Sequence, residues 1–149
     1  MEQSEYLDKL MEAGKILGEW DNNKVSGLTP QWFWDRQIGM LDFRGDLRIM
    51  SSENITFGFG VKILTASHDF SAGAIGNTEY KKCWIYDNVF VGSFSLLYNC
   101  VLERNVLVAC GSVVRSMRVP EYCYVEGNPA KITRKYTGGR WKNITTLKK

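Results

Sequence analysis

The sequence predicts an all-β protein built as a parallel β-helix, and three observations support this prediction. Aliphatic residues recur every six positions from about Gly45 to Val114. In most of these units a small or turn-forming residue follows the bulky apolar one, and a second apolar residue stands four places after the first. A period of six fits neither the helical period of about 3.6 nor the alternation of a simple strand. A coil that turns a corner every six residues has this period.

The period has a simple geometric origin. Each six-residue unit, or hexad, lays one short strand on a face of a prism and points one aliphatic side chain inward. Coils stack through strand hydrogen bonds, so each unit is stable only beside its neighbours. An antiparallel sandwich, the alternative, would show turn clusters about every 8–12 residues and no fixed register. The corners need residues that tolerate a tight backbone, and these stand at Gly58, Gly60, Asn88, Gly92, Asn105 and Gly111.

Composition limits the partners and the location. The 149 residues make one domain, long enough to bury a core. A net charge of +3 is too small to indicate a nucleic-acid partner. The sequence shows neither an apolar run of membrane-spanning length nor an export signal at its start. We therefore expect no stable membrane insertion and a cytoplasmic location.

The cysteines and the single histidine argue against a metal site. The four cysteines show no Cys-x-x-Cys spacing, and His68 is the only histidine. A zinc site of cysteine and histidine needs several such ligands at close spacing. We expect no bound metal, and reduced thiols that pack as small apolar groups.

The non-repetitive parts of the chain divide the domain. We expect a single domain over 1–149 with an N-terminal helical segment, a β-helix and a C-terminal segment, at 1–44, 45–127 and 128–149. Residues 69–84 break the six-residue period, so they should project from the prism as a loop. The register also slips by one residue within 95–102, where the sequence is one residue short of two hexads.

The flanking segments carry helix signals. Residues 4–20 begin with a serine that can cap a helix and have apolar side chains at helical spacing, which predicts an amphipathic helix packed on the β-helix. Thr29 and Pro30 predict the start of a short second helix. Its aromatic residues 32–34 could line a sugar site or pack in the core. Pro129 should begin a short C-terminal helix, followed by a frayed tail.

Three segments of the chain resemble the hexapeptide-repeat acyltransferases. They read IYDNVFVGS, NVLVACGSVV and VPEYCYVEGNPAKI, at 85–93, 105–114 and 119–132. The similarity covers about residues 49–135 and is greatest to short sugar O-acetyltransferases of the maltose and galactoside type and to enzymes that modify surface polysaccharides. The resemblance implies a left-handed β-helix, a homotrimer, and acetyl-CoA bound as donor in clefts between neighbouring subunits.

The resemblance also implies a catalytic base. His68 lies in the segment LTASHDF, which is similar to the family motif with a catalytic histidine at the end of a hexad, just before a loop. A neutral imidazole can take the proton from an acceptor hydroxyl, which then attacks the acetyl thioester. Candidates to orient this imidazole are Asp69, Glu79, Asn54 and Asp87. We assign Asp69 to the catalytic group, although neighbouring side chains on a strand point to opposite faces.

Other family positions correspond to residues around the acetyl group and the acceptor. The backbone N–H of Ser93 corresponds to the oxyanion donor. Gly92 either leaves room for the thioester or only turns a corner. Phe90 stands where many relatives have a tryptophan beside the acceptor sugar, and Trp84 is the alternative ring.

For coenzyme A, the family uses small residues of late hexads and nearby cations. The small residues that would line the pantetheine arm are Ala109, Cys110, Gly111 and Ser112. The cations near the adenine and phosphates would be Arg115, Lys131 and Arg134. Such cations can hold the 3′-phosphate through charge-assisted hydrogen bonds, or can simply be solvated.

The sequence therefore predicts an acetyl-CoA-dependent O-acetyltransferase. Its acceptor would be a sugar, either in a cell-surface polysaccharide or linked to a nucleotide or lipid. Alternatives are N-acetylation of an amino sugar, of serine or of an antibiotic, and a catalytically silent scaffold. A carbonic anhydrase of the same fold needs three histidines on zinc, which chains with one histidine each cannot supply at every interface.

Overall fold

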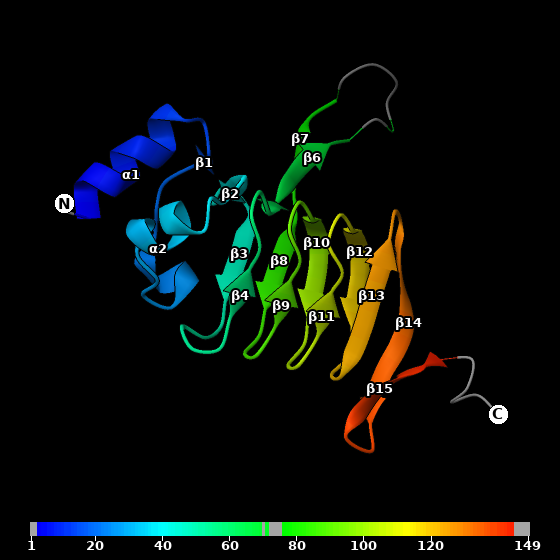
Figure 1. The fold of residues 1–149 in the computed structure, drawn as a ribbon. Coiled ribbons are helices and arrows are strands. Elements are labelled where there is room, and N and C mark those ends of the chain that lie inside the picture. The colour runs from blue at the N-terminus through cyan, green and yellow to red at the C-terminus, as the bar shows by residue number, and fades with distance from the viewer. Residues whose placement is uncertain (1–2, 70, 72–75, 145–149) are drawn as a thin grey trace.

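The structure is a computed structural model that describes residues 3–69, 71 and 76–144. This part of the chain is mainly β and has two short α-helices, α1 (Gln3–Glu12) and α2 (Pro30–Asp35), with a 3-10 helix, η1 (Asn22–Val25), between them. None of its helices is both long and apolar enough to cross a membrane. The helices lie at one end of a stack of strands, and the C-terminal strands lie at the other (Figure 1).

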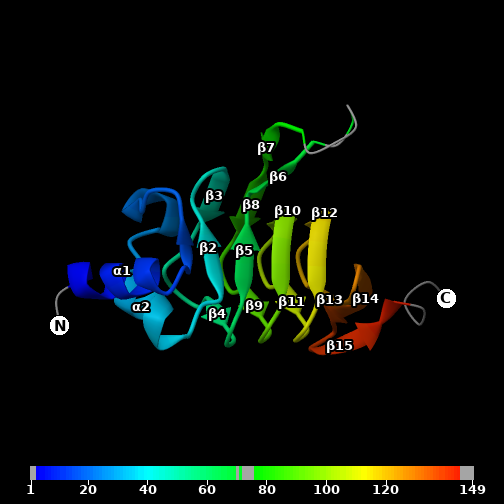
Figure 2. The same cartoon turned by 90° about the horizontal axis from the view of Figure 1, so that it is seen from above.

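Parallel strands form three faces of a prism (Figure 1 and Figure 2). The first face contains β1 (Ile16–Leu17), β2 (Met40–Asp42), β5 (Lys62–Leu64) and the first halves of β10 (Leu96–Leu102) and β12 (Val113–Val119). The second contains β3 (Asp46–Ile49), β8 (Lys82–Ile85) and the second halves of β10 and β12. The third contains β4 (Thr56–Phe57), β9 (Phe90–Val91), β11 (Leu107–Val108) and β13 (Cys123–Gly127). Each coil visits the faces in this order, which confirms the predicted parallel coil.

The length of a coil explains the slip in the repeat. Stacked residues such as Cys83 and Cys100 are 17 positions apart, one fewer than three complete hexads. The missing residue belongs to the corner between the first and second faces. There Asn99 and Ser116 each turn the chain alone, with φ of 48° and 52°. The shortened unit within 95–102 is therefore a tight corner in the middle of β10.

The other two corners also use left-handed backbone in successive coils. Between the third and first faces this conformation recurs at Gly60, Phe94 and Gly111. Between the second and third faces it recurs at Asn54, Asn88, Asn105 and Tyr122. The amide groups of Asn88 and Asn105 are hydrogen bonded to each other from one coil to the next. Asparagine tolerates this backbone better than most side chains, which is why it marks these corners.

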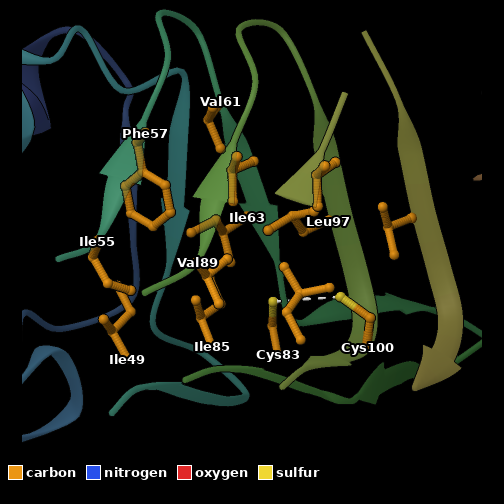
Figure 3. Packing of buried hydrophobic residues seen from close by; sticks show 14 of the residues in the cluster. Ile49, Ile55, Phe57, Val61, Ile63, Cys83, Ile85, Val89, Leu97 and Cys100 are labelled. Atoms are coloured by element: carbon orange, nitrogen blue, oxygen red, sulfur yellow. Dashed lines mark hydrogen bonds between the residues drawn. The ribbon is translucent and has the colours of Figure 1, made fainter. Parts of the chain in front are cut away.

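The core consists of inward side chains stacked from coil to coil (Figure 3). On the first face Ile63, Leu97 and Val114 occupy the same position in three successive coils, and all three are fully buried. Burying one such aliphatic side chain contributes about 1.5–3 kcal/mol. The stacked columns are therefore the main source of stability, as the hexad pattern predicts.

Two cysteines continue this stacking on the second face. The Sγ atoms of Cys83 and Cys100 lie 3.8 Å apart inside the core (Figure 3). The hydrogen bond with Cys100 and burial raise the pKa of Cys83 well above its ordinary value, so Cys83 packs as a neutral thiol. Cys123 is also buried, whereas Cys110 is exposed. In the described residues, no three His, Cys, Asp or Glu side chains are grouped so as to hold a metal ion.

The N-terminal helix is shorter than the predicted 4–20. It ends at Glu12 because Gly14, with φ of 70°, adopts the left-handed conformation that closes a helix C-terminus. The chain then becomes extended, and β1 pairs in parallel with β2. Apolar residues after Gly14 therefore extend the first face instead of continuing the helix.

The second helix begins where the sequence predicts. The Thr29 hydroxyl accepts a hydrogen bond from the Trp32 N–H at 3.1 Å. Phe33 is fully buried, with its ring centroid 5.0 Å from that of Trp32 and 6.4 Å from that of Phe57. Of the two interpretations of residues 32–34, the structure supports packing against the first coil.

The C-terminal segment differs from the prediction. Within 128–144, a hairpin of β14 (Ala130–Thr137) and β15 (Arg140–Asn143) extends the third face antiparallel to β13, so the predicted short helix is wrong. Gly138 and Gly139 have φ of 61° and 81°, as a two-residue hairpin turn requires. The β-branched and aromatic residues before them favour a strand. The end of the predicted frayed tail, 145–149, lies outside the described residues.

Replacing Leu97 with alanine should lower the free energy of unfolding by about 2–5 kcal/mol, because a fully buried side chain leaves a cavity between coils. Leu96→Ala is the matched control. It changes the same residue type on the same strand, but this side chain is only half-buried and points outward. We expect a loss of about 1 kcal/mol or less there. Urea unfolding followed by tryptophan fluorescence measures both, and equal losses would contradict the inward and outward assignment.

Candidate active site

A hairpin projects from the corner between the first and second faces (Figure 1 and Figure 2). Its strands, β6 (Ala66–His68) and β7 (Thr78–Tyr80), pair antiparallel. The projecting segment thus differs from the predicted 69–84, because it begins at Ala66 and the wall resumes with β8 at Lys82. Cys83 and Ile85 are fully buried within that wall. The aliphatic pattern did not show that the wall begins again at β8, because the first inward residue of this strand is Cys83.

His68 is the last residue of β6, and its side chain is exposed. In the hairpin register Thr78 lies opposite His68, and Glu79 lies opposite Ser67. Side chains alternate along each strand, so His68 and Thr78 share one face of the hairpin and Glu79 lies on the other. The imidazole is thus carried away from the core on a two-stranded arm.

Two of the predicted partners of His68 lie on the hairpin and have other contacts. The Asp69 carboxylate accepts a hydrogen bond from the Ser71 N–H at 2.9 Å. Hydrogen bonds from the Ser71 N–H and side chain lower the pKa of Asp69. The Oε2 atom of Glu79 lies 3.8 Å from the Nζ atom of Lys81. Both carboxylates are thus near enough in sequence to act on His68, but alternation directs them to the opposite face.

The other two predicted partners lie elsewhere. Asn54 precedes β4, and Asp87 follows β8. Both are at the corner between the second and third faces, whereas the hairpin leaves from the corner between the first and second. Asn54 and Asp87 are therefore on the far side of the second face from the hairpin root.

A buried hydrogen-bond network holds the hairpin root. Asp42 is fully buried and accepts bonds from the Arg44 N–H, Nε and Nη2 at 3.0, 2.9 and 3.1 Å, and from the Thr65 N–H at 3.0 Å. The Thr65 hydroxyl donates to the Asp42 carbonyl at 3.1 Å and accepts from the Gly45 N–H at 2.8 Å. The Thr65 carbonyl accepts from the Lys81 N–H at 2.7 Å. Since Thr65 precedes β6 and Lys81 follows β7, the network reaches both strands of the hairpin.

Charge and close packing both fix this root. Burial alone raises the pKa of Asp42, but hydrogen bonds from the Arg44 side chain and from the Thr65 and Arg44 N–H groups, with the guanidinium charge, hold it below its ordinary value. A Cβ atom at Gly45 would lie 2.3 Å from the Thr65 carbonyl oxygen and 2.6 Å from that of Lys81. The chain entering the second face therefore touches both ends of the hairpin.

Sequence reasoning missed this network. The available signal was an acid and an arginine two positions apart, Asp42 and Arg44, beside the buried Leu41 and Phe43. Residues two apart on a strand point to the same side, which predicts an ion pair. The bond to Thr65, 23 residues away, depends on the coil length and could not be predicted.

The predicted donor-binding residues lie at the corner between the third and first faces. Gly92 and Ser93 lead from β9 to β10, and residues 109–112 lead from β11 to β12. Cys110 and Gly111 are exposed, and a Cβ atom added at Gly111 would meet no atom within 4 Å. This corner, called the donor corner below, therefore offers small residues and open space to a ligand.

Three of these residues also have structural roles. A Cβ atom at Gly92 would lie 2.5 Å from the Cys110 nitrogen, so close packing of the coils requires glycine there. The Ser93 hydroxyl accepts a hydrogen bond from the Phe59 N–H at 3.1 Å and joins two coils. Ser112 is buried, and its hydroxyl donates to the Ala109 carbonyl at 2.6 Å. The Ser112 hydroxyl thus faces the interior of the corner.

The predicted phosphate-binding cations lie on two faces near the C-terminal end of the prism. Arg115 is exposed on β12, in the first face. Lys131 and Arg134 are exposed on β14, next to the third face. The Arg134 guanidinium carbon lies 4.8 Å from the ring centroid of Tyr124. The cations therefore flank the donor corner from both sides and do not form one cluster.

Trp84, a predicted acceptor-binding ring, lies on the second face. Its indole Nε1 donates to Asp46 Oδ2 at 3.1 Å. The Arg48 guanidinium carbon and the Lys82 Nζ lie 5.0 and 5.1 Å from its ring centroid. The ring is half-buried beside these cations, on the face that begins at the hairpin root.

Phe90, the other predicted ring, lies on the third face. It lines a hollow of about 380 Å³ together with Tyr122, Tyr136 and Trp141. Tyr136 and Trp141 come from the C-terminal hairpin. Because the sequence predicted a helix and a tail there, it did not predict this hollow. Phe90 is thus separated from the His68 hairpin by the second face.

One chain does not bring the predicted base and donor corner together. The hairpin leaves at the C-terminal ends of the first-face strands, and the donor corner lies at their N-terminal ends (Figure 2). The distance across this face, from Gly60 to Thr65, is roughly 15 Å for extended chain. His68 and Ser93 therefore belong to opposite edges of the first face.

Solved structures with this fold include acyltransferases. A maltose O-acetyltransferase from Clostridium difficile 630 is 27% identical over 60% of this chain and 49% of that chain, with a TM-score of 0.54. A mutant N-acyltransferase from Bacillus cereus, in complex with dTDP-4-amino-4,6-dideoxyglucose and coenzyme A, is 19% identical over 70% and 59%, with a TM-score of 0.51. A hexapeptide-repeat-containing acetyltransferase from Vibrio cholerae O1 biovar eltor, complexed with acetyl coenzyme A, is 19% identical over 91% and 87%, with a TM-score of 0.47.

The matched part of this chain spans about half the length of the maltose O-acetyltransferase. The likeness to the Bacillus cereus enzyme shows a shared fold. No protein-family model matches the sequence, and no curated protein sequence matches it.

The stability supplied by Asp42 should be lost in acid. Its pKa in the folded chain lies below the ordinary value of about 3.8, so its contribution is complete above that pH and disappears as the pH falls through the folded-state pKa. At pH 7, Asp42→Asn should lower the free energy of unfolding by about 2–3 kcal/mol. Urea unfolding of parent and variant from pH 7 to pH 2.5 should show the gap closing only below about pH 4. A gap that stayed constant down to pH 2.5 would contradict this assignment.

Proposed function

We propose that this chain is a hexapeptide-repeat acyltransferase and that it transfers an acetyl group from acetyl-CoA to a sugar hydroxyl. The family's left-handed coiling is part of the same proposal. Its support is the combination of the hexad coil, the histidine hairpin and the open donor corner in one chain. The 27% identity to a maltose O-acetyltransferase favours a sugar acceptor.

The observation that carries the proposal is the position of His68. It is the only histidine, it is exposed, and it stands on the one hairpin that leaves the coil within the described wall. In this proposal His68 takes the proton from the acceptor hydroxyl as the oxygen attacks the acetyl carbon. Acetyl-CoA supplies the activated acetyl group as a thioester. The Ser93 N–H then donates a hydrogen bond to the carbonyl oxygen on which negative charge develops.

The donor corner fits the narrow pantetheine arm of coenzyme A. Ala109, Cys110 and Gly111 present little side-chain volume, and the space beside Gly111 is open. Arg115 on one side and Arg134 on the other offer guanidinium groups to phosphates. These residues hold and orient the donor in our proposal, whereas Ser112 keeps the corner in shape from within.

We propose that a neighbouring subunit completes the site, in a homotrimer. A base and an oxyanion donor on opposite edges of one face, roughly 15 Å apart, cannot both reach one reacting acetyl group within one chain. Two large apolar side chains at the donor corner, Phe59 and Phe94, are 55% and 73% exposed. Large exposed apolar side chains that stand together favour burial against another subunit.

The acceptor is proposed as a sugar of a cell-surface polysaccharide or a nucleotide- or lipid-linked precursor. Trp84 is on the face that adjoins the hairpin root and can stack on a sugar ring from there. Phe90 is the less favourable of the two rings, because it lies in the hollow on the third face. The alternative, transfer to an amino group, uses the same base and donor and differs only in the acceptor.

Substituting His68 with alanine should reduce acetyl-CoA-dependent thiol release by about 10²–10⁴-fold with an acceptor found by screening sugars, nucleotide sugars and amines. Coenzyme A affinity should stay within about twofold, because in this proposal His68 acts on the acceptor hydroxyl and does not hold coenzyme A. A thiol-release assay measures the rate, and titration calorimetry measures the affinity for coenzyme A. Activity within about threefold of the parent would contradict the role of His68, and no thiol release with any acceptor would favour the silent scaffold.

Mixing two inactive variants should restore activity if the site lies between subunits. His68→Ala removes the base, and Cys110→Trp fills the donor corner at an exposed position. After joint unfolding and refolding in equal amounts, about one quarter of the sites combine an intact hairpin with an intact corner. We expect about one quarter of the parental rate, and sedimentation near three chains. An inactive mixture of verified mixed trimers would show that base and donor corner come from the same chain.

A further inference from the structure

The hairpin that carries His68 has little lateral support. Within the described residues, β6 and β7 pair only with each other and form a sheet separate from the two sheets of the prism. A two-stranded hairpin alone is marginally stable in water. The direction in which it presents His68 must therefore be fixed at its root.

Asp42 occupies the centre of that root. Its carboxylate accepts four hydrogen bonds, two on each oxygen, from Arg44 and Thr65. A carboxylate has about four acceptor positions, so all of them are used although the group is fully buried. A buried carboxylate is stable only when it is satisfied in this way. Any rotation of Thr65 relative to Asp42 would leave it short of a donor.

The later coils offer an internal comparison. At the same corner they have Asn99 and Ser116, joined by a single exposed hydrogen bond of 3.2 Å between their side chains. Neither position is linked to a buried acid by any hydrogen bond of the described residues. The ion pair of the buried Asp42 with Arg44 lies at the corner of the neighbouring coil, and Asp42 bonds across to Thr65 at the hairpin root. The network is thus found where the hairpin leaves and not at the later corners.

We propose that Asp42 is the positioning residue for His68. Through the N–H of Thr65, and through Arg44, it fixes the angle at which β6 leaves the prism. The chain of contacts runs from Asp42 to Thr65, from the Thr65 carbonyl to Lys81, and so to both strands of the hairpin. The role in catalysis rests on the proposed function of His68, whereas the role in placing the imidazole does not.

The substitution Asp42→Asn tests the inference. In asparagine an NH₂ group, which cannot accept hydrogen bonds, replaces one carboxylate oxygen that accepts two. At least two of the four hydrogen bonds are therefore lost, while the pairing of the strands in the coils remains. His68 is the only histidine, so in a tag-free protein its imidazole Hε1 proton gives one NMR signal that needs no assignment to a residue. We expect this signal to change its chemical shift, or its line width to increase about twofold or more. With an identified acceptor, kcat should fall about 10–100-fold with the KM for acetyl-CoA unchanged.

Asp46→Asn is the matched control. Asp46 and Arg48 form the same two-residue pair as Asp42 and Arg44, with an Nε–Oδ1 distance of 2.8 Å, but both side chains are about half exposed. The histidine signal should not change in this variant. Val108→Ala, a core change remote from the hairpin, separates loss of stability from loss of position, because it should lower the unfolding midpoint and leave the signal unchanged.

A second pair of variants keeps the inference testable if Asp42→Asn does not fold. Thr65→Val removes the hydroxyl that bonds Asp42 and Gly45, and should reproduce the changed histidine signal. Thr65→Ser retains the hydroxyl and should restore the parental signal. An unchanged signal in Asp42→Asn or Thr65→Val, or the same change in Asp46→Asn, would overturn the inference. A changed signal in a protein that acetylates no acceptor would uphold the inference and refute the proposed function.

Discussion

Each coil of the prism has to place its inward side chains on those of the coil before it, and the rest of the structure depends on this stacking. Ile63, Leu97 and Val114 form one such column. An extra residue inside a strand would turn every following side chain to the other side of the wall. A segment that does not repeat must therefore leave at a corner, as the hairpin of His68 does. The location of the only histidine is thus a consequence of core packing as well as of chemistry.

The local part of this arrangement could be predicted from the sequence, and the long-range part could not. The inward residues, most corners and the Thr29 cap depend on near neighbours, so their patterns were sufficient. The extent of the hairpin was hidden because Cys83 takes an inward position that the aliphatic pattern does not mark. The segment after Pro129 is compatible with helix or strand, and its pairing with β13 decides the outcome. The bond between Asp42 and Thr65 joins two coils, and only the folded chain brings them together.

The same division applies to the candidate site. Family motifs indicated His68, Gly92 and Ser93 by their sequence context, but the faces on which they lie follow from the 17-residue coil. Gly92 shows how one residue can satisfy two requirements, since the close approach of Cys110 demands glycine whether or not a thioester binds beside it. Motif similarity alone could not separate these requirements. The geometry adds that the His68 hairpin and the corner of Gly92 and Ser93 lie at different edges of the first face.

The 17-residue coils from β8 onward also determine how this chain can change in length. Because stacked residues repeat every 17 positions, duplicating one coil between β10 and β12 would preserve every column and every corner. It would move the C-terminal hairpin about 4.8 Å along the prism axis and leave the network around Asp42 untouched. Insertions of other sizes are confined to the corners. The distance between the C-terminal hairpin and the histidine hairpin along the prism axis can therefore vary only in steps of one strand spacing.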